Sequence, residues 1–230
     1  MKNAFGSSPI IAGGSGLQKY MMSVYNKMFM ALGLTGIVSL VCASNPDVLQ
    51  FMAGGFSFIL MLAMLGIVFY LSAGIRNMDV DRANALFWVY SALVGASISP
   101  IFAIYTGESI ATSFFTAAMF FGGMSLYGYT TKKDLTVMGS FMIVGLFAII
   151  ITSIVNLFLK SSALQMGLSA LSIIVFCGLT AYDIQKIRSF YATSADEETL
   201  KKVAVLGALN LYLDFINIFL HLLRFLGKRR

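Results

Sequence analysis

Apolar residues are gathered along the chain into seven long runs, which short polar segments separate. A helix needs about 20 residues to cross a bilayer core of roughly 30 Å, and each run is about that long. The second run is long enough to bend near Gly54 and Gly55 or near Gly66, and the charged stretch 186–202 predicts a long break before the last run. The runs predict membrane-spanning helices over residues 22–42, 48–75, 83–105, 109–129, 135–159, 163–187 and 205–226.

Composition supports a membrane protein and removes most classes of enzyme. Hydrophobic residues make up 58% of the 230 positions and charged residues 11%, whereas soluble domains carry about 25% charged residues. His221 is the only histidine, and Cys42 and Cys177 lie in different runs without a CxxC motif, so zinc and dithiol sites are not expected. The sequence therefore predicts an all-α membrane protein that is not an enzyme and has no nucleic-acid partner.

Lys and Arg residues are distributed unequally between the two ends of the predicted helices. One end collects eleven: Lys2, Lys19, Lys27, Arg76, Arg82, Lys132, Lys133, Lys186, Arg188, Lys201 and Lys202. The other end has five: Lys160, Arg224, Lys228, Arg229 and Arg230. Since loops rich in Lys and Arg stay in the cytoplasm, we expect a cytoplasmic tail of residues 1–20 and a single transmembrane domain of residues 21–230. The thirteen Leu, Ile and Phe residues of the last run favour a full crossing despite its basic tail.

Two carboxylates, Asp183 and Asp214, lie inside hydrophobic runs, where an ionisable residue is expected to be functional. Polar residues at helical spacing form one stripe along the last helix: Asn210, Asp214, Asn217, His221 and Arg224. The sixth helix has a weaker stripe: Gln165, Ser169, Ser172, Thr180 and Asp183. We expect the two stripes to face each other, with Arg76 nearby at the cytoplasmic end of the second helix.

The pattern of these residues suggests pH-sensitive binding of a hard cation. Two carboxylates close together in a low-dielectric site cannot both ionise easily, so they share a proton and respond to pH. When both are ionised they offer oxygen ligands that suit Ca²⁺, and Asn210 or Asn217 can add carbonyl oxygens. Thr180 and His221 are expected to line the same pathway. An ion pair with Arg76 would compete with the cation and hold a gate shut.

Each of these residues also has a simpler interpretation. Asp183 can pair with Lys186 or Arg188 at the membrane boundary, and Asp214 can belong to a purely structural pair. Arg76 can be an ordinary positive anchor at a helix end, and a single histidine is more typical of a polar stripe or interface than of a metal site. The residues alone leave both interpretations open.

Three segments resemble the Bax inhibitor-1 family of transmembrane Bax-inhibitor-motif proteins: residues 124–132, 178–186 (GLTAYDIQK) and 207–220 (GALNLYLDFINIFL). The resemblance implies seven transmembrane helices, the last one central and surrounded by the other six, and a pH-sensitive Ca²⁺ leak. It matches Asp183 and Asp214 to the family's aspartate dyad and Arg76 to its latch arginine. It also implies a bacterial inner-membrane protein without a tightly bound cofactor, whose partners are lipid, Ca²⁺ and protons.

Two other functions stay open on the sequence. A non-conducting regulator would bind another membrane protein, for example a membrane-anchored protease, and small residues at Ser91, Gly95 and Ser99 would support helix contacts inside or between chains. An intramembrane aspartyl protease would also use paired aspartates. Its second motif is Gly-x-Gly-Asp, however, whereas residues 211–214 of this chain read Leu-Tyr-Leu-Asp.

Overall fold

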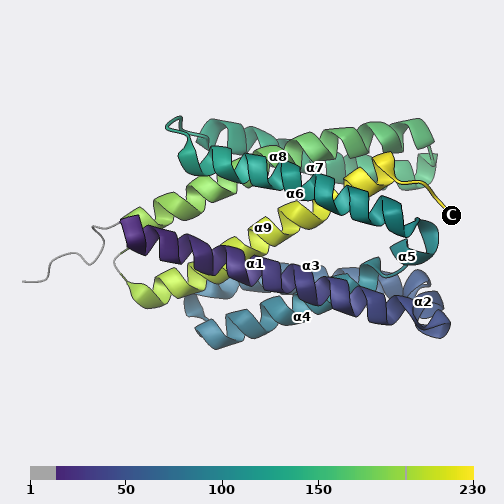
Figure 1. Cartoon of the computed structure of the whole chain (residues 1–230), viewed down its shortest axis with the longest axis horizontal. Helices are drawn as coiled ribbons and strands as arrows, with labels where there is room; N and C mark the ends of the chain where they lie inside the picture. The colour runs from purple at the N-terminus through teal and green to yellow at the C-terminus, as the bar shows by residue number, and fades with distance from the viewer. Residues whose placement is uncertain (1–13, 195) are drawn as a thin grey trace, which may run out of the picture.

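The computed structural model describes residues 14–194 and 196–230, which are almost entirely helical (Figure 1). The described residues form these elements: α1 (Gly14–Ala43), α2 (Pro46–Ala53), α3 (Phe56–Gly74), the 3₁₀ helix η1 (Ile75–Asn77), α4 (Val80–Ile98), α5 (Ile101–Ile104), α6 (Gly107–Thr130), α7 (Thr136–Leu159), α8 (Ser162–Thr193) and α9 (Glu197–Leu226). Seven segments are long and apolar enough to cross a membrane, with α3 and η1 forming one of them and α4 and α5 another. The prediction of an all-α membrane protein with seven spans is confirmed.

Two of the predicted helices are interrupted near one end. The second run breaks at Gly54 and Gly55, as the sequence suggested, and its first part becomes the short helix α2. The start of α2 is stabilised because the Asn45 side chain accepts hydrogen bonds from the first backbone amides of the helix. Pro46, which occupies the first turn, also favours a helix start. The third run breaks after Ile98, where Pro100 lacks the amide hydrogen that a continuous helix would need.

The prediction of a long charged break over residues 186–202 is wrong, because α8 continues to Thr193 and α9 already begins at Glu197. The Asp196 side chain caps α9 by accepting from the backbone amides of residues 198 and 199. On the first turns of α9, Lys201 and Lys202 each form an ion pair of 2.8 Å with the glutamate four residues earlier. Local capping and charge pairing therefore extend the helix beyond its apolar part. Helix α1 begins at Gly14, so residues 14–20 are helical, while residues 1–13 of the predicted tail lie outside the described part.

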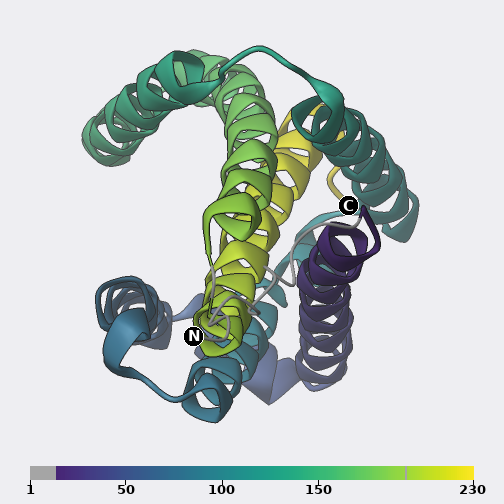
Figure 2. The same ribbon diagram turned by 90° about the vertical axis from the view of Figure 1, so that its left-hand side faces the viewer.

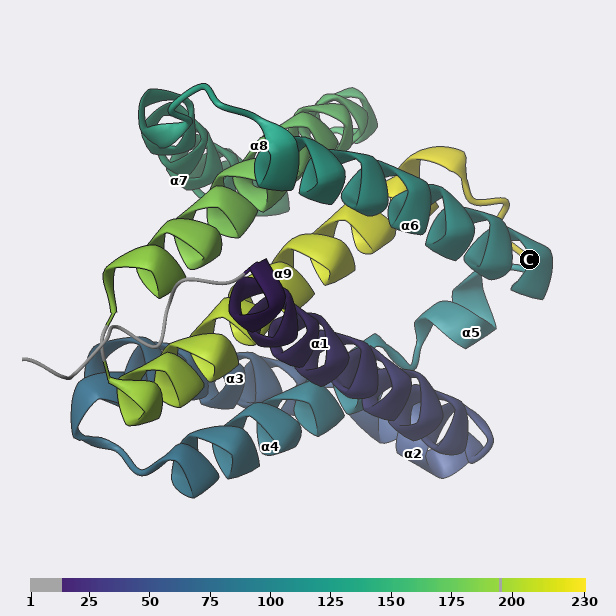
Figure 3. The same cartoon turned by 60° about the vertical axis from the view of Figure 1, so that its left-hand side comes forward.

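Helix α9 runs diagonally between two groups of helices (Figures 1 and 3). One group contains α1, α3 and α4, and the other contains α6, α7 and α8. Helix α9 packs directly on α8, α6, α1 and α4, whereas α3 packs on α4 and α7 packs on α8. In the most apolar window of each helix, 67% of α9 is buried but only 6% of α7. The last helix is therefore the central one, with α3 and α7 in an outer position.

The bundle has two distinct ends. The amino-terminal end carries the start of α1, η1, the connection 131–135, the end of α8 and the start of α9, and the carboxyl terminus lies at the opposite end (Figure 1). There, the Thr106 amide donates to the Lys228 carbonyl at 3.2 Å and the Arg230 amide donates to the Ile104 carbonyl at 2.9 Å. A continuous α9 that joins both ends agrees with a full crossing rather than a re-entrant helix.

Candidate functional site

A cavity of about 610 Å³ lies against α9 on the side that faces α3 and α7. Figure 2 shows these two outer helices on the same side of the molecule, with α8 and α9 running beside them through its middle. Most of the lining is apolar and comes from five helices: Met61, Met64, Leu65, Val68, Tyr90, Ile143, Leu146, Ile150, Phe176, Leu179 and Leu213. The polar lining residues gather on α8 and α9: Tyr182, Asp183, Lys186, Asn210, Asp214 and Asn217. We refer to this space as the aspartate cavity.

Small residues hold α8 in the position that brings Asp183 to this cavity. Gly128 of α6 lies against the backbone of Ala181, and Gly139 of α7 lies against the ring of Tyr182. A side chain at either glycine would overlap these atoms, so only glycine permits the close approach. The amide of Gln185 bonds the connection between α6 and α7, accepting from the Leu135 amide and donating to the Lys133 carbonyl, each at 2.8 Å. The carboxyl-terminal part of α8 is thus fixed on both sides of Asp183.

Asp214 is the most unusual polar side chain of the cavity. It is only 4% exposed, and its Oδ2 atom has no hydrogen-bond partner among the residues that the structure describes. The hydroxyl of the nearby Thr180 donates to the Phe176 carbonyl of its own helix at 2.8 Å. A buried carboxylate oxygen without a partner is costly unless a proton or a cation neutralises it. The arrangement therefore leaves a place for one of these two species.

Two asparagines extend the same wall of the aspartate cavity. Asn210 and Asn217 lie one turn before and about one turn after Asp214 on α9, and both line the cavity. The Asn217 side-chain amide donates to the Leu213 carbonyl at 2.8 Å, which leaves its carbonyl oxygen to face other groups. With the two carboxylates, these residues provide an oxygen-rich strip inside an apolar space.

Lys186 is the cation that the structure places in this cavity. It follows Asp183 by one helical turn, and its Nζ lies 5.7 Å from the centre of the Tyr182 ring. Arg188, in contrast, donates to the Tyr129 carbonyl at 2.6 Å and lies over the Tyr129 ring. Of the two basic residues that the sequence offered as partners for Asp183, Lys186 is therefore the one that lines the same cavity as the carboxylate. The sequence signal for Lys186 was its separation of three residues from Asp183 on the same helix.

Three predicted site residues lie outside the lining of the cavity. Arg76 is exposed and belongs to η1, at the amino-terminal end of the bundle. His221 is half-buried and stacks on Phe176 with 6.4 Å between ring centres, and Thr180 is fully buried between α8 and its neighbours. The described geometry thus groups Asp183, Asp214 and the asparagines without Arg76, whose role as a latch stays a prediction.

The donor set does not resemble a resident metal centre. Among residues 14–194 and 196–230, no cluster of three or more His, Cys, Asp or Glu side chains could hold a metal ion. Two carboxylates with amide oxygens beside them suit a cation that binds weakly and leaves again, since tight Ca²⁺ sites use six to eight oxygen ligands.

Comparison with known proteins decides the family. Residues 17–230 match the family model described as "Inhibitor of apoptosis-promoting Bax1". The chain belongs to the Bax inhibitor-1 family. Among relatives, it is 50% identical over 216 residues to the uncharacterized protein RP147 of Rickettsia prowazekii, covering 94% of this chain and 92% of that one. It is 43% identical over 228 residues to the inner membrane protein YbhL of Escherichia coli, covering 97% of each chain. The resemblance seen in the three sequence segments is confirmed, and both aspartates lie inside the matched region.

Proposed function

We propose that this member of the Bax inhibitor-1 family is a pH-sensitive Ca²⁺ leak of the inner membrane, controlled by Asp183 and Asp214. The observation that carries the proposal is the aspartate cavity, in which a buried and unpartnered Asp214 oxygen shares one apolar space with Asp183. Similarity to YbhL, which is named an inner membrane protein, supports the location. The charge distribution supports a cytoplasmic amino terminus.

In this proposal the carboxylates act as a proton-controlled cation site. With both ionised, Asp183 and Asp214 bind Ca²⁺ together with the carbonyl oxygens of Asn210 and Asn217. Acidification protonates the pair, removes one negative charge and weakens the binding of the cation. Flux through the protein depends on release as well as on binding, so the pH dependence of flux reports both steps.

Lys186 supplies the competing positive charge in the described conformation. Its ammonium group can approach Asp183 when no cation is bound, and the face of the Tyr182 ring offers it a second resting place. Because Lys186 is exposed, each of these contacts is weak enough to exchange with Ca²⁺. Arg76 would have to move from its exposed place at the end of α3 to perform the same role.

The test is Ca²⁺ uptake by liposomes that contain the purified protein, measured over a pH series. We expect Asp214→Asn to lower uptake to the level of empty liposomes and Asp183→Asn to lower it with flattened pH dependence, because each removes a charge and preserves size. Asp47→Asn, an exposed carboxylate in the first turn of α2, is the matched control and should behave like wild type. If both cavity variants conduct Ca²⁺ with unchanged pH dependence, the proposal fails.

The small residues that could have contacted a regulatory partner are packed inside the chain itself. A Cβ atom on Gly95 would lie 2.6 Å from the Thr35 carbonyl oxygen, so Gly95 is in contact with α1. Ser91 and Ser99 are fully buried. This stripe therefore supports packing between α1 and α4, and we rank the non-conducting regulator below the leak. We also propose that the chain has no enzymatic activity.

A further inference from the structure

A second cavity, of about 660 Å³, lies on the opposite side of α9 from the aspartate cavity. It separates α1 from α6, which both pack on α9 and enclose the space with it. Figure 2 shows these two helices together on the side away from α3 and α7. The lining residues are Gln18, Met21, Met22, Tyr25, Phe29, Ala118, Phe121, Gly122, Ser125, Leu126, Tyr129 and Phe215. We refer to it as the α1–α6 cavity.

The lining changes from polar to apolar along the bundle axis. Gln18 lies near the start of α1 and Tyr129 near the end of α6, so both belong to the amino-terminal end of the bundle. Ala118 lies 11 residues before Tyr129 on α6, a distance of roughly 16 Å along a helix. Around it, Phe29 and Phe215 complete an apolar inner part. The cavity thus has a polar entrance at the level of a membrane surface and an apolar interior, as an amphipathic molecule requires.

Ser125 marks the boundary between these two parts. It is 6% exposed and lines the cavity beside the Tyr25 hydroxyl of α1, and its own hydroxyl makes no hydrogen bond of normal geometry among the described residues. Two other hydroxyls of α6, those of Thr116 and Thr130, each donate to the carbonyl four residues earlier, at 2.7 and 2.8 Å. A buried hydroxyl that does not bond its own helix is available to a ligand with an acceptor oxygen.

We propose that the α1–α6 cavity binds one acyl chain of a membrane glycerophospholipid, with the ester carbonyl accepting a hydrogen bond from Ser125. The chain occupies the inner part beside Phe29, Ala118 and Phe215, and the headgroup lies at the entrance near Gln18. Between two helices that face the bilayer, lipid is the species present at the highest concentration. Arg188, which lies over the outer lining residue Tyr129, adds a positive charge close to the position of the phosphate. This proposal does not depend on Ca²⁺ transport.

Two neighbouring glycines of α6 provide a matched test. Gly122 lines the cavity and Gly123 does not, and a Cβ atom on either would meet nothing within 4 Å. Gly122→Leu should fill the cavity and Gly123→Leu should not, and neither substitution should disturb helix packing. Native mass spectrometry of the purified chain, titrated with palmitoyl-oleoyl-phosphatidylglycerol, measures how much of the most tightly bound lipid each variant retains. We expect Gly122→Leu to remove this lipid and Gly123→Leu to retain it.

The polar contact is tested with two buried serines of α6. Ser125→Ala should weaken binding of the phospholipid about fivefold, the effect of losing one ordinary hydrogen bond. Ser113→Ala removes a hydroxyl that is also buried and unpartnered in the described chain but lies outside the cavity lining, so it should have no effect. Equal lipid retention by both glycine variants would overturn the proposal. Binding of oleate in place of the phospholipid would overturn the choice of ligand.

Discussion

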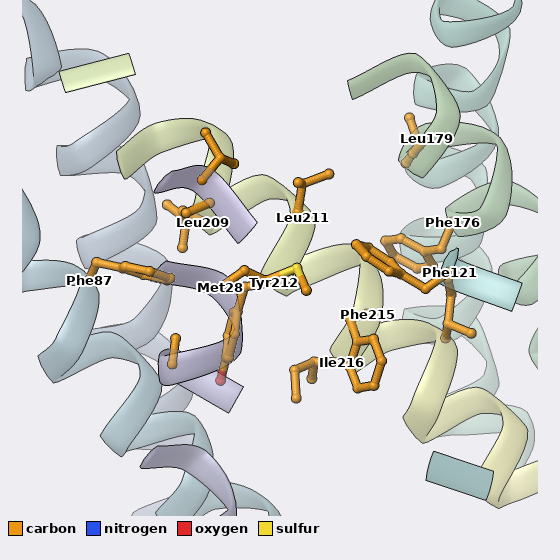
Figure 4. Packing of buried hydrophobic residues seen from close by; sticks show 14 of the residues in the cluster. Met28, Phe87, Phe121, Phe176, Leu179, Leu209, Leu211, Tyr212, Phe215 and Ile216 are labelled. Atoms are coloured by element: carbon orange, nitrogen blue, oxygen red, sulfur yellow. The ribbon is translucent and has the colours of Figure 1, made fainter. Parts of the chain in front are cut away.

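Tyr212 and Asp214 are two buried polar side chains on opposite faces of α9, and they differ in the hydrogen-bond partners that the surrounding helices provide. Tyr212 is fully buried, and its hydroxyl lies 2.7 Å from that of Thr35, which in turn donates to the Ser91 carbonyl at 2.8 Å. Its ring packs edge-on against Phe87 at 5.8 Å and Tyr90 at 6.0 Å, and Figure 4 shows it in one buried cluster with Met28 and Phe87. Every polar atom of this group has a partner, so the side of α9 that faces α1 and α4 is a packed and satisfied interface.

Asp214, only two residues later, faces the aspartate cavity with one oxygen that has no hydrogen-bond partner in the described part of the chain. Successive residues on a helix turn by about 100°, so two residues of separation place side chains on opposite faces. Natural cores seldom leave a buried polar atom unsatisfied unless it has a function. The difference teaches that burial alone does not mark a functional group, whereas burial beside a cavity without a partner does.

The largest effect on stability is expected from the satisfied face. Tyr212→Ala removes the ring that joins α1, α4 and α9 and should destabilise the protein by about 3–5 kcal/mol, as for other buried aromatic residues. Tyr212→Phe retains the ring and should cost only about 1 kcal/mol, the net value of a hydrogen bond. Thermal unfolding in detergent measures both. A loss of Ca²⁺ uptake in a Tyr212→Phe protein that remains folded would break the division between the two faces.

The sequence predicted the seven spans well because the signal is local, and it singled out the two aspartates by a signal that is local too. A run of 20 apolar residues and a carboxylate inside it can be recognised without knowledge of the neighbouring helices. The charged residues after Lys186 were misread, since a capping Asp196 and pairs such as Glu197 with Lys201 extend a helix beyond its apolar part. Hydropathy does not register these polar interactions.

The residues that line the cavity beside the two aspartates were harder to predict from the sequence. Asn210 and Asn217 share the face of Asp214 on one helix, so their place in the cavity follows from spacing. Arg76 and His221 depend on how α3 and α8 are rotated against α9, which a single sequence does not specify. The second cavity had no local signal at all, because its apolar lining looks like any lipid-facing surface. Among the described residues, the buried Ser125 hydroxyl without a hydrogen bond marks this cavity.

The second prediction concerns the positive charge that opposes the aspartates. Lys186→Gln should raise resting Ca²⁺ uptake by up to about fivefold, since a partly exposed ion pair contributes up to ~1 kcal/mol. Arg76→Ala should raise uptake less, because Arg76 lies outside the described cavity lining. Both are measured in liposomes at neutral pH. A stronger effect of Arg76→Ala would show that the closed state brings Arg76 to the dyad and that Lys186 is only a neighbour.

The smallest effect is expected at an exposed carboxylate whose bonds are satisfied. The Thr199 hydroxyl, with backbone amides of the first turn, donates to Asp196 and lowers its pKa. This contribution to stability is complete above the usual pKa of an unfolded aspartate, near 4, and is lost as the pH falls through the lowered value in the folded protein. Thermal midpoints measured from pH 5 to pH 3 should therefore fall slightly less for Asp196→Asn, which preserves the cap without the charge.

Asp196→Asn also provides a control for the aspartate cavity. Because Asp196 lies before α9 in the connection 194–196, its substitution should leave the pH dependence of Ca²⁺ binding unchanged. A change in that dependence would mean that exposed carboxylates, and not the buried pair, determine the response to pH.

The most direct test of the central claim is equilibrium Ca²⁺ binding to the purified protein between pH 5 and pH 8, measured with radioactive Ca²⁺. Wild-type protein should bind Ca²⁺ at neutral pH and progressively less on acidification, and the double variant Asp183→Asn with Asp214→Asn should not bind it at any pH. Binding to the double variant at the wild-type level, or wild-type binding that stays constant over this range, would contradict the assignment of the two aspartates as the proton-controlled cation site.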